Sequence, residues 1–232
     1  MNFVLYEFDT KIENLYKLQL GVERDVWGII MFQKELEIIN HHVSEGARLR
    51  TLFFEENARL IIDVAGTIAA SLVKGGKVLI CGNGGSAADA QHMAAELVGR
   101  YKLERPPLPA IALTTDTSIL TCISNDYSFK DVFSRQVKGI GQEGDVLIAI
   151  STSGRSKNIL NAIDAAKEKN IQTIGLTGVK GIRFVDKCDY ALIVPTDSTP
   201  LIQEIHISII HLICELIDVF LFEEVEKLDL YG

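Results

Sequence analysis

The sequence predicts an α/β fold: a doubly wound, parallel, five-stranded sheet flanked by helices, with N-terminal helices before it and a long C-terminal helix after it. Short apolar runs alternate with segments of helical periodicity, which is typical of βαβ units. Glycine, serine, threonine or proline closely follows each apolar run. The 232 residues, 47% of them hydrophobic, suffice for one full core, whereas two domains would be crowded.

The expected elements follow one another in βα order. Helices are predicted at 33–44 and 55–73, ahead of the first strand, and these could pack beside the C-terminal helix. The strands are predicted at 77–80, 110–113, 146–150, 172–176 and 190–194. The helices between and after them are predicted at 86–98, 117–123, 131–140 and 156–169, with a last apolar helical stretch at 205–222.

Composition and charge exclude several classes of protein. The net charge of −8, without a run of lysines or arginines, opposes nucleic-acid binding. The four cysteines lack C-x-x-C spacing, so neither a zinc ribbon nor a disulfide framework is expected, and a cytoplasmic location fits best. The N-terminus has no basic segment typical of a secretory signal. Because His206, His211, Glu215 and Asp218 interrupt 205–222, we expect a buried or interfacial helix and no membrane association.

A glycine-rich turn with a His/Glu pair is the first candidate site. Residues 81–86, Cys-Gly-Asn-Gly-Gly-Ser, join a predicted strand to a helix, where free backbone N–H groups can hold an anion. His92 and Glu96 follow in that helix, and four residues turn it by about 400°, so both side chains emerge on one face. An i,i+4 pair of this kind is also compatible with a plain surface hydrogen bond.

A second candidate anion site is the run Ser-Thr-Ser-Gly-Arg-Ser at 151–156, where a strand meets the next helix. These hydroxyls could instead only cap the helix. Two such turns in one parallel sheet favour ligand binding at its carboxyl edge.

Polar residues farther along the chain add weaker signals. Gln203 and His211 are separated by about 12 Å of helix, so one metal ion could reach both only if the side chains lean together or different subunits contribute them. We interpret His206, between them, as structural. Asn125 and Asp126 follow the helical stretch 117–123 and could be turn formers or ligands.

Taken in order, the motifs resemble a known family. They are Gly82-Asn83-Gly84-Gly85-Ser86, Asp89-Ala90-Gln91-His92, Ala95-Glu96-Leu97, Gly99-Arg100-Tyr101, Ser124-Asn125-Asp126, Phe133-Ser134-Arg135, Glu143-Gly144-Asp145-Val146-Leu147, Ile150-Ser151-Thr152-Ser153-Gly154, and Ile202-Gln203-Glu204-Ile205-His206 with His211. This series is similar to the sugar isomerase (SIS) domain of the sedoheptulose 7-phosphate isomerase, or phosphoheptose isomerase, family. The similarity covers about residue 35 to the end, so 35–232 is expected to form the SIS domain and 1–34 an N-terminal extension.

The resemblance implies a homotetramer with active sites at subunit interfaces. It places a zinc ion on His92, Glu96, Gln203 and His211, and the catalytic pair on Glu96 and His211. Arg155 and Pro200-Leu201 stand where the family often has Asn and Asp-Arg. The substrate contacts carried over are Asn83, Gly84, Gly85, Ser86, Glu96, Asn125, Asp126, Ser151, Thr152, Ser153, Ser156 and Gln203.

The implied reaction converts D-sedoheptulose 7-phosphate to D-glycero-D-manno-heptose 7-phosphate through an enediol, in heptose precursor biosynthesis. Such an aldose–ketose isomerase needs a base at C1 and an acid at C2, roles that Glu96 and His211 can fill. Two alternatives are a non-catalytic SIS tetramer that regulates replication initiation by protein binding, and a sugar-phosphate sensor without turnover. The joint presence of Glu96 and His211 favours the enzyme.

Overall fold

The structure is a computed structural model that describes residues 32–231. The chain divides into two compact units, Met1–Glu45 and Gly46–Gly232, and the sheet belongs to the second. Most of the expected extension, residues 1–31, lies outside the described residues, and its boundary at residue 34 stays a prediction.

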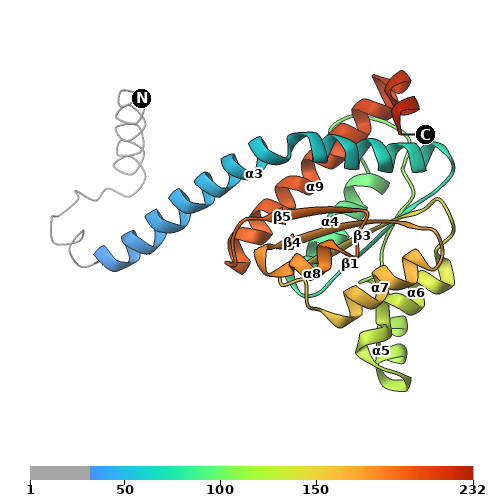
Figure 1. The fold of residues 1–232 in the computed structure, drawn as a ribbon, viewed down its shortest axis with the longest axis horizontal. Coiled ribbons are helices and arrows are strands. Elements are labelled where there is room, and N and C mark those ends of the chain that lie inside the picture. Colours follow the sequence, from blue (N-terminus) through green and yellow to red (C-terminus); the bar gives the residue numbers. More distant parts are fainter. Residues whose placement is uncertain (1–31, 232) are drawn as a thin grey trace. The chain divides into compact units, whose positions relative to one another are not determined.

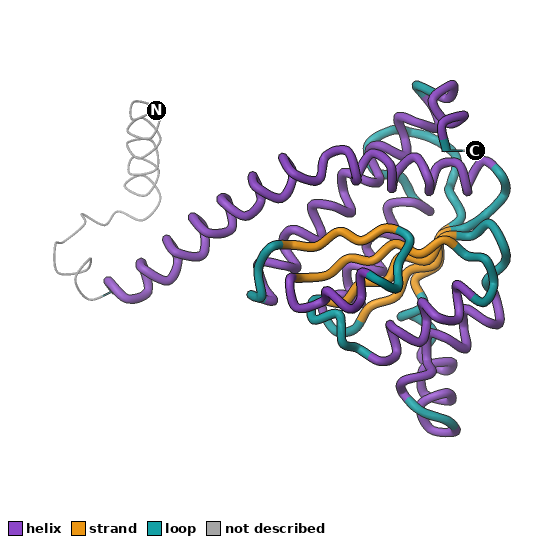
Figure 2. The backbone as a smooth tube through the Cα atoms, in the orientation of Figure 1, coloured by secondary structure: helices purple, strands orange, loops and turns teal. Residues whose placement is uncertain are grey.

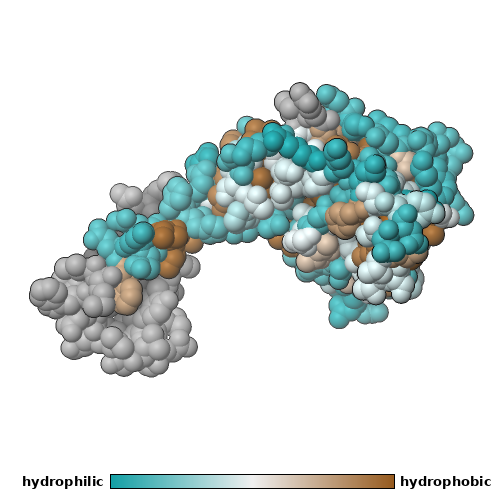
Figure 3. Space-filling model, turned by 90° about the horizontal axis from the view of Figure 1, so that it is seen from below, coloured by the Kyte–Doolittle hydropathy of each residue, from teal (hydrophilic) through white to brown (hydrophobic). Residues whose placement is uncertain are grey.

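In the first unit, the described residues begin a long helix, α3 (Gln33–Val73). Four apolar side chains near its start are exposed: Phe32, Leu36, Ile39 and Val43. Their spacing of four, three and four residues puts them on one stripe of a helix. Figure 3 shows hydrophobic patches among the hydrophilic surface along this helix.

The second unit is built on a parallel sheet of five strands in the order β2-β1-β3-β4-β5. This order confirms the doubly wound sheet predicted from the alternation of elements. The strands are β1 (Val78–Gly82), β2 (Ala110–Ala112), β3 (Val146–Ser151), β4 (Gln172–Gly178) and β5 (Tyr190–Val194). All five coincide with predicted strands, because each carries a short, mainly apolar run.

Helices cover both faces of the sheet, as Figures 1 and 2 show. One face packs on α4 (Gly85–Val98), α9 (Thr199–Phe222) and the part of α3 in this unit. The other face packs on α5 (Thr117–Asp126), α6 (Val132–Ile140) and α7 (Lys157–Lys167). A short helix, α8 (Ile182–Val185), and three 3₁₀ turns, η1 (Phe129–Asp131), η2 (Val179–Gly181) and η3 (Val225–Leu230), complete the described elements.

Two details of the prediction were wrong. The separate helices expected at 33–44 and 55–73 are one continuous helix, since Leu49 and Phe53 in the intervening stretch are buried on its core side and no proline interrupts it. Asn125 and Asp126 belong to the last turn of α5 instead of a loop. The Asp116 side chain accepts a hydrogen bond from Ile119 N (2.8 Å) and so caps the start of that helix.

The C-terminal helix α9 is a core helix, as expected. By length and composition it could cross a membrane, but 56% of its apolar window is buried within the protein. Its residues share one core with α3, and Arg50 of α3 donates a hydrogen bond to the Ser208 hydroxyl of α9. The predicted packing of the earlier helix beside α9 is thereby confirmed for the second unit.

Candidate active site

The two glycine- and serine-rich turns lie at neighbouring strand ends. From β1 the chain crosses to β2 on one side of the sheet and later returns to β3 on the other side, so β1 and β3 flank the switch point. Gly82 at the end of β1 is in register with Ile150 near the end of β3. The turns that follow these strands therefore meet at the crevice where such sheets bind ligands.

Both turns leave the N-terminus of the following helix without a side-chain cap. The N-cap residue of α4 is Gly84, with φ +57°, and no side chain caps this helix. The N-cap residue of α7 is Ser156, whose hydroxyl makes no cap bond and instead accepts from Ser151 Oγ at 3.3 Å. In the same turn Gly154 has φ +61°, which suits glycine. The interpretation of Ser156 as a mere helix cap is therefore wrong, and both N-termini keep N–H groups suited to a phosphate.

A pair of asparagine amides joins the two turns. Asn83 Nδ2 donates to Asn158 Oδ1 at 2.9 Å, and Asn158 Nδ2 donates to Asn83 Oδ1 at 2.8 Å. Asn158 is buried in the first turn of α7. Sequence reasoning missed Asn158, because no local spacing signals a partner 75 residues away. The amide pair fixes the relative position of the two candidate anion sites.

Helices α4 and α9 lie side by side and run in the same direction. A Cβ atom added at Gly85, at the start of α4, would lie 2.4 Å from Gln203 Nε2 on α9, so the glutamine amide rests against the glycine-rich turn. Seven to eight residues farther along both helices, His211 Nε2 is 3.1 Å from His92 Nε2. Gln203 thus lies against the glycine-rich turn, whereas His211 contacts His92 of the His92/Glu96 pair.

His92, Glu96 and His211 form one cluster. His92 Nε2 is 3.0 Å from Glu96 Oε1, and one potential ligand atom from each residue lies within 4.8 Å of the others. Ligands bound 2.0–2.1 Å from a tetrahedral zinc ion lie about 3.3 Å apart, so two imidazole nitrogens and a carboxylate at these separations fit such an ion. The His92 side chain is 43% exposed and that of Glu96 23%, which leaves the cluster open to a ligand.

Two further titratable groups lie close to these elements. Burial raises the pKa of Asp89, on α4, to about 6, although the nearby His92 charge opposes the shift. Burial lowers the pKa of His206, on α9, to about 4, so this imidazole is neutral at pH 7. His206 is fully buried, which confirms its assignment as a structural residue. Sequence reasoning missed Asp89 as a partly buried carboxylate, because its spacing alone does not reveal burial.

The other predicted contacts are arranged more loosely. Asn125 Nδ2 donates to Asp126 Oδ1 at 2.8 Å, and both residues are exposed at the end of α5. In the turn after β3, Arg155 N donates to Ser153 Oγ at 3.3 Å, and Thr152 O accepts from Gly178 N at 3.1 Å. Within the described part of the chain, the hydrogen bonds of Asn125 and Asp126 go to one another and to Cys122, not to the cluster.

Two departures from the family pattern have structural reasons. Pro200 lies in the first turn of α9, where a missing N–H costs nothing. Leu201 is buried in the core beside Gly46, so a charged side chain would not suit that position here.

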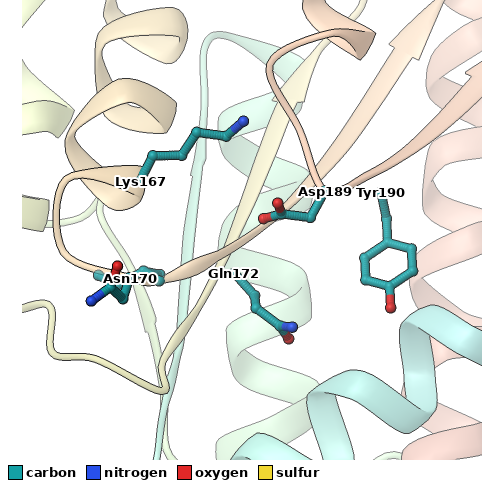
Figure 4. A pocket seen from close by; sticks show the side chains of 6 residues that line it. Lys167, Asn170, Gln172, Asp189 and Tyr190 are labelled. Carbon is teal, nitrogen blue, oxygen red and sulfur yellow. The ribbon is translucent and has the colours of Figure 1, made fainter.

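A cavity at the opposite edge of the sheet is not the candidate site. It has a volume of about 520 Å³ and lies at the amino ends of β4 and β5, as Figure 4 shows. Parallel sheets bind ligands at the other edge, and no predicted site residue lines this cavity. Its lining residues are Lys167, Asn170, Ile171, Gln172, Asp189 and Tyr190.

The sequence matches known proteins over most of its length. Residues 41–178 match the SIS domain family. The chain is 53% identical over 201 residues to the phosphoheptose isomerase of Maridesulfovibrio salexigens, covering 87% of this chain and 98% of that protein. It is 59% identical over 164 residues to the phosphoheptose isomerase of a Bradyrhizobium species, covering 69% and 83%.

Solved structures agree with this match. The phosphoheptose isomerase of Neisseria gonorrhoeae superposes with a TM-score of 0.75 at 44% identity, covering 79% of this chain and 98% of that chain. The Francisella tularensis phosphoheptose isomerase gives a TM-score of 0.77 at 38% identity with the same coverage. The fold and the domain match together define a SIS-domain protein. Within that class, the chain belongs to the phosphoheptose isomerase family.

Proposed function

We propose that this protein isomerises D-sedoheptulose 7-phosphate to D-glycero-D-manno-heptose 7-phosphate, a step of heptose precursor biosynthesis. The observation that carries the proposal is the meeting of Glu96 with His211, two residues 115 positions apart, in one partly exposed cluster with His92. A carboxylate and an imidazole within reach of one substrate are the groups that an aldose–ketose isomerisation requires.

The phosphate group of the substrate binds at the two uncapped helix N-termini. Backbone N–H groups of both turns and the hydroxyls of the 151–156 turn supply donors to its oxygens. The reciprocal amide pair of Asn83 and Asn158 supports this assignment, because it holds the two turns as one unit. The contacting residues are Asn83, Gly84, Gly85, Ser86, Ser151, Thr152, Ser153 and Ser156, with Asn125, Asp126, Glu96 and Gln203 contacting the sugar.

Glu96 and His211 move the protons. Glu96 takes a proton from C1 of the ketose, and the electron pair of that C–H bond forms the C1–C2 double bond of an enediol, while O2 takes up a proton. His211 then delivers a proton to C2, and the O1 proton passes to solvent, which leaves the aldehyde at C1. Solvent also supplies the proton on O2, takes up the proton from Glu96 and reprotonates His211, so the catalytic pair is restored. No atom is gained or lost overall, so the reaction needs no external oxidant or reductant.

In this proposal a zinc ion would be held by His92, Glu96, Gln203 and His211. The two imidazole nitrogens and the carboxylate have the donor chemistry and the separations that zinc favours. When bound, such an ion would supply electrophilic stabilisation for the oxygens at C1 and C2. In the isolated chain the Gln203 amide rests against Gly85, so it has to turn along α9 to join the other three ligands.

The working form is a cytoplasmic homotetramer with active sites between subunits. His92, the first residue of the cluster, lies seven residues, or about 10 Å of helix, beyond the start of α4. The phosphate-binding turns and the cluster of one chain are therefore separated along α4. The exposed stripe of Phe32, Leu36, Ile39 and Val43 is the kind of surface that a second copy covers. A measured solution mass of four chains is expected, and a monomer would contradict this proposal.

A direct assay tests the function. The purified protein is incubated with sedoheptulose 7-phosphate, and formation of the aldose is followed with and without a chelator. We expect turnover that the chelator suppresses and added zinc restores. Binding of the sugar phosphate without any aldose would instead indicate a sensor, and neither binding nor turnover would favour the protein-binding tetramer.

A further inference from the structure

The segment that follows α4, residues 99–105, packs along one face of α9. His211, Glu215 and Asp218 are spaced by four and three residues, so they share that face. Each contacts a residue of the segment. The Tyr101 ring stacks on His211 (centroids 5.5 Å apart), Lys102 Nζ donates to both carboxylate oxygens of Glu215 (2.9 Å each), and Arg105 Nε donates to Asp218 Oδ1 (2.8 Å).

The last of these contacts is buried. The side chains of Arg105 and Asp218 are 1% and 7% exposed. The rest of the Arg105 guanidinium binds the end of α4: Nη2 donates to Glu96 O at 3.0 Å, and Nη1 donates to Leu97 O at 2.8 Å and Gly99 O at 3.3 Å. Arg105 therefore donates hydrogen bonds to backbone carbonyls that the C-terminus of a helix leaves without partners.

The Arg105 guanidinium thus hydrogen-bonds to the turn of α4 that carries Glu96. Through Asp218 it also binds α9, the helix that carries His211. We propose that Arg105 and Asp218 are positioning residues: they hold α4 and α9 in the register at which Glu96, His92 and His211 converge. The proposal rests on the metal and proton-transfer roles proposed above for these three residues.

The register of α4 and α9 needs positioning residues, because a small shift of either helix separates the side chains of the cluster. A slip of one residue moves a helix by about 1.5 Å and turns its side chains by about 100°. A misplacement of about 1 Å in an active site can cost 10²-fold in rate. Arginine suits this task because its planar fork serves several acceptors at once, which a lysine ammonium does not reproduce.

A purely structural role predicts something different. Buried ion pairs often add little net stability, but removing one partner is costly wherever the pair lies. A second ion pair with a buried carboxylate, Lys77 Nζ with Asp145 Oδ2 at 2.7 Å, lies at the amino ends of β1 and β3, away from the cluster. It provides a matched control, because its disruption should cost stability without changing the register of α4 and α9.

The test measures metal affinity by titrating the metal-free full-length protein with Co²⁺ and following its absorption. We expect Arg105→Lys to lower the affinity by about 10- to 100-fold, the usual effect of changing a residue that orients metal ligands. Asp218→Asn keeps an acceptor oxygen and the size of the side chain, so it serves as the milder variant if Arg105→Lys folds poorly. Asp145→Asn should keep the wild-type affinity.

Three results would overturn the proposal: wild-type affinity in both Arg105→Lys and Asp218→Asn, an equal loss of affinity in Asp145→Asn, or no change in hydrogen exchange of the 92–98 amides in the first two variants. Failure of the metal proposal is distinguishable, since the wild-type protein would then bind no Co²⁺. In that case kcat decides: a loss of about tenfold or more in Arg105→Lys but not in Asp145→Asn supports positioning, and equal values reject it.

Discussion

The two edges of the sheet use their polar groups in opposite ways. At the amino edge carboxylates are saturated: Asp145 accepts from Lys77 N, Lys77 Nζ and Gln142 N, and Asp189 accepts from Thr173 N and Oγ1. At the carboxyl edge, the N-cap residues of α4 and α7, which follow β1 and β3, make no side-chain cap hydrogen bond. The difference separates polar groups that hold the fold from those left available to a ligand.

The same contrast extends to the outer face of α4 and α9. His92 and Glu96 bond mainly to one another and to His211, and they keep exposed surface. The neighbouring pair of Arg105, in the segment after α4, and Asp218, on α9, is buried. Residues left open to a ligand therefore lie beside a buried pair that holds their helices in place, and five substitutions or conditions test the difference between open and buried polar groups.

The largest effect should come from Glu96→Gln. Removing the base should lower kcat by about 10²- to 10⁴-fold, the usual contribution of a positioned general base. The free energy of unfolding should change little, because Glu96 is partly exposed and its bond to His92 is local. Steady-state kinetics with urea unfolding as the control checks this, and near-wild-type turnover would remove Glu96 from the mechanism.

At the amino edge of the sheet we expect the reverse: a loss of stability without a loss of kcat. Asp145→Asn leaves the Lys77 ammonium without its charged partner in a site where the carboxylate is 2% exposed, so unfolding should become easier by roughly 3 kcal/mol. The kcat of the folded enzyme should stay at the wild-type value. Urea unfolding and kinetics at low temperature measure the two quantities, and a large loss of kcat would break the proposed division between the edges.

Acid should act through His206, which is buried on α9. Its pKa is about 4 in the folded protein and about 6.5 in the unfolded chain, so only the unfolded chain takes up a proton between these values. The stability contributed by the neutral imidazole is thus fully present above pH 6.5 and is lost as pH falls, by about 3 kcal/mol at pH 4.

The measurement compares urea unfolding at pH 7 and pH 4.5 for the wild type and for His206→Leu. The leucine variant should lose less stability on acidification than the wild type. An identical pH dependence in both proteins would show that His206 does not carry this effect.

Metal removal should show that the cluster binds metal without contributing to the stability of the fold. Dialysis of His92→Ala against a chelator and then against zinc should leave less metal per chain than the wild type retains, since one of the ligands is missing. The circular dichroism spectrum should not change, because the exposed imidazole packs little core. Equal metal content in the two proteins would exclude His92 as a ligand.

The smallest effect on stability is expected at Ser156. Ser156→Ala should raise KM for the sugar phosphate while the unfolding free energy changes by less than about 0.5 kcal/mol, because the hydroxyl caps no helix N–H. Asp116→Ala is the matched control: it removes a real cap and should cost about 1 kcal/mol without affecting KM. A reversed pattern would restore the capping interpretation of the 151–156 turn.

Much of this arrangement follows from local sequence. All five strands were predicted, because a strand buried on both faces must be a short apolar run ended by turn residues. The faces of α4 and α9 also follow from helical periodicity, which places His92 beside Glu96. The continuity of α3 did not follow, since core contacts at Leu49 and Phe53 override local propensity, and α5 continues through Asp126, beyond its predicted end at residue 123.

The sequence by itself therefore determined the sheet, its two candidate anion-binding turns and the residue types of the candidate site. Only the tertiary structure decided which of those residues meet: that His211 reaches His92 and Glu96, that Gln203 rests on the glycine-rich turn, and that Arg105 ties α4 to Asp218. The physical reason is that periodicity fixes the face on which a side chain lies, whereas the partner of that face depends on the packing of helices more than a hundred residues apart.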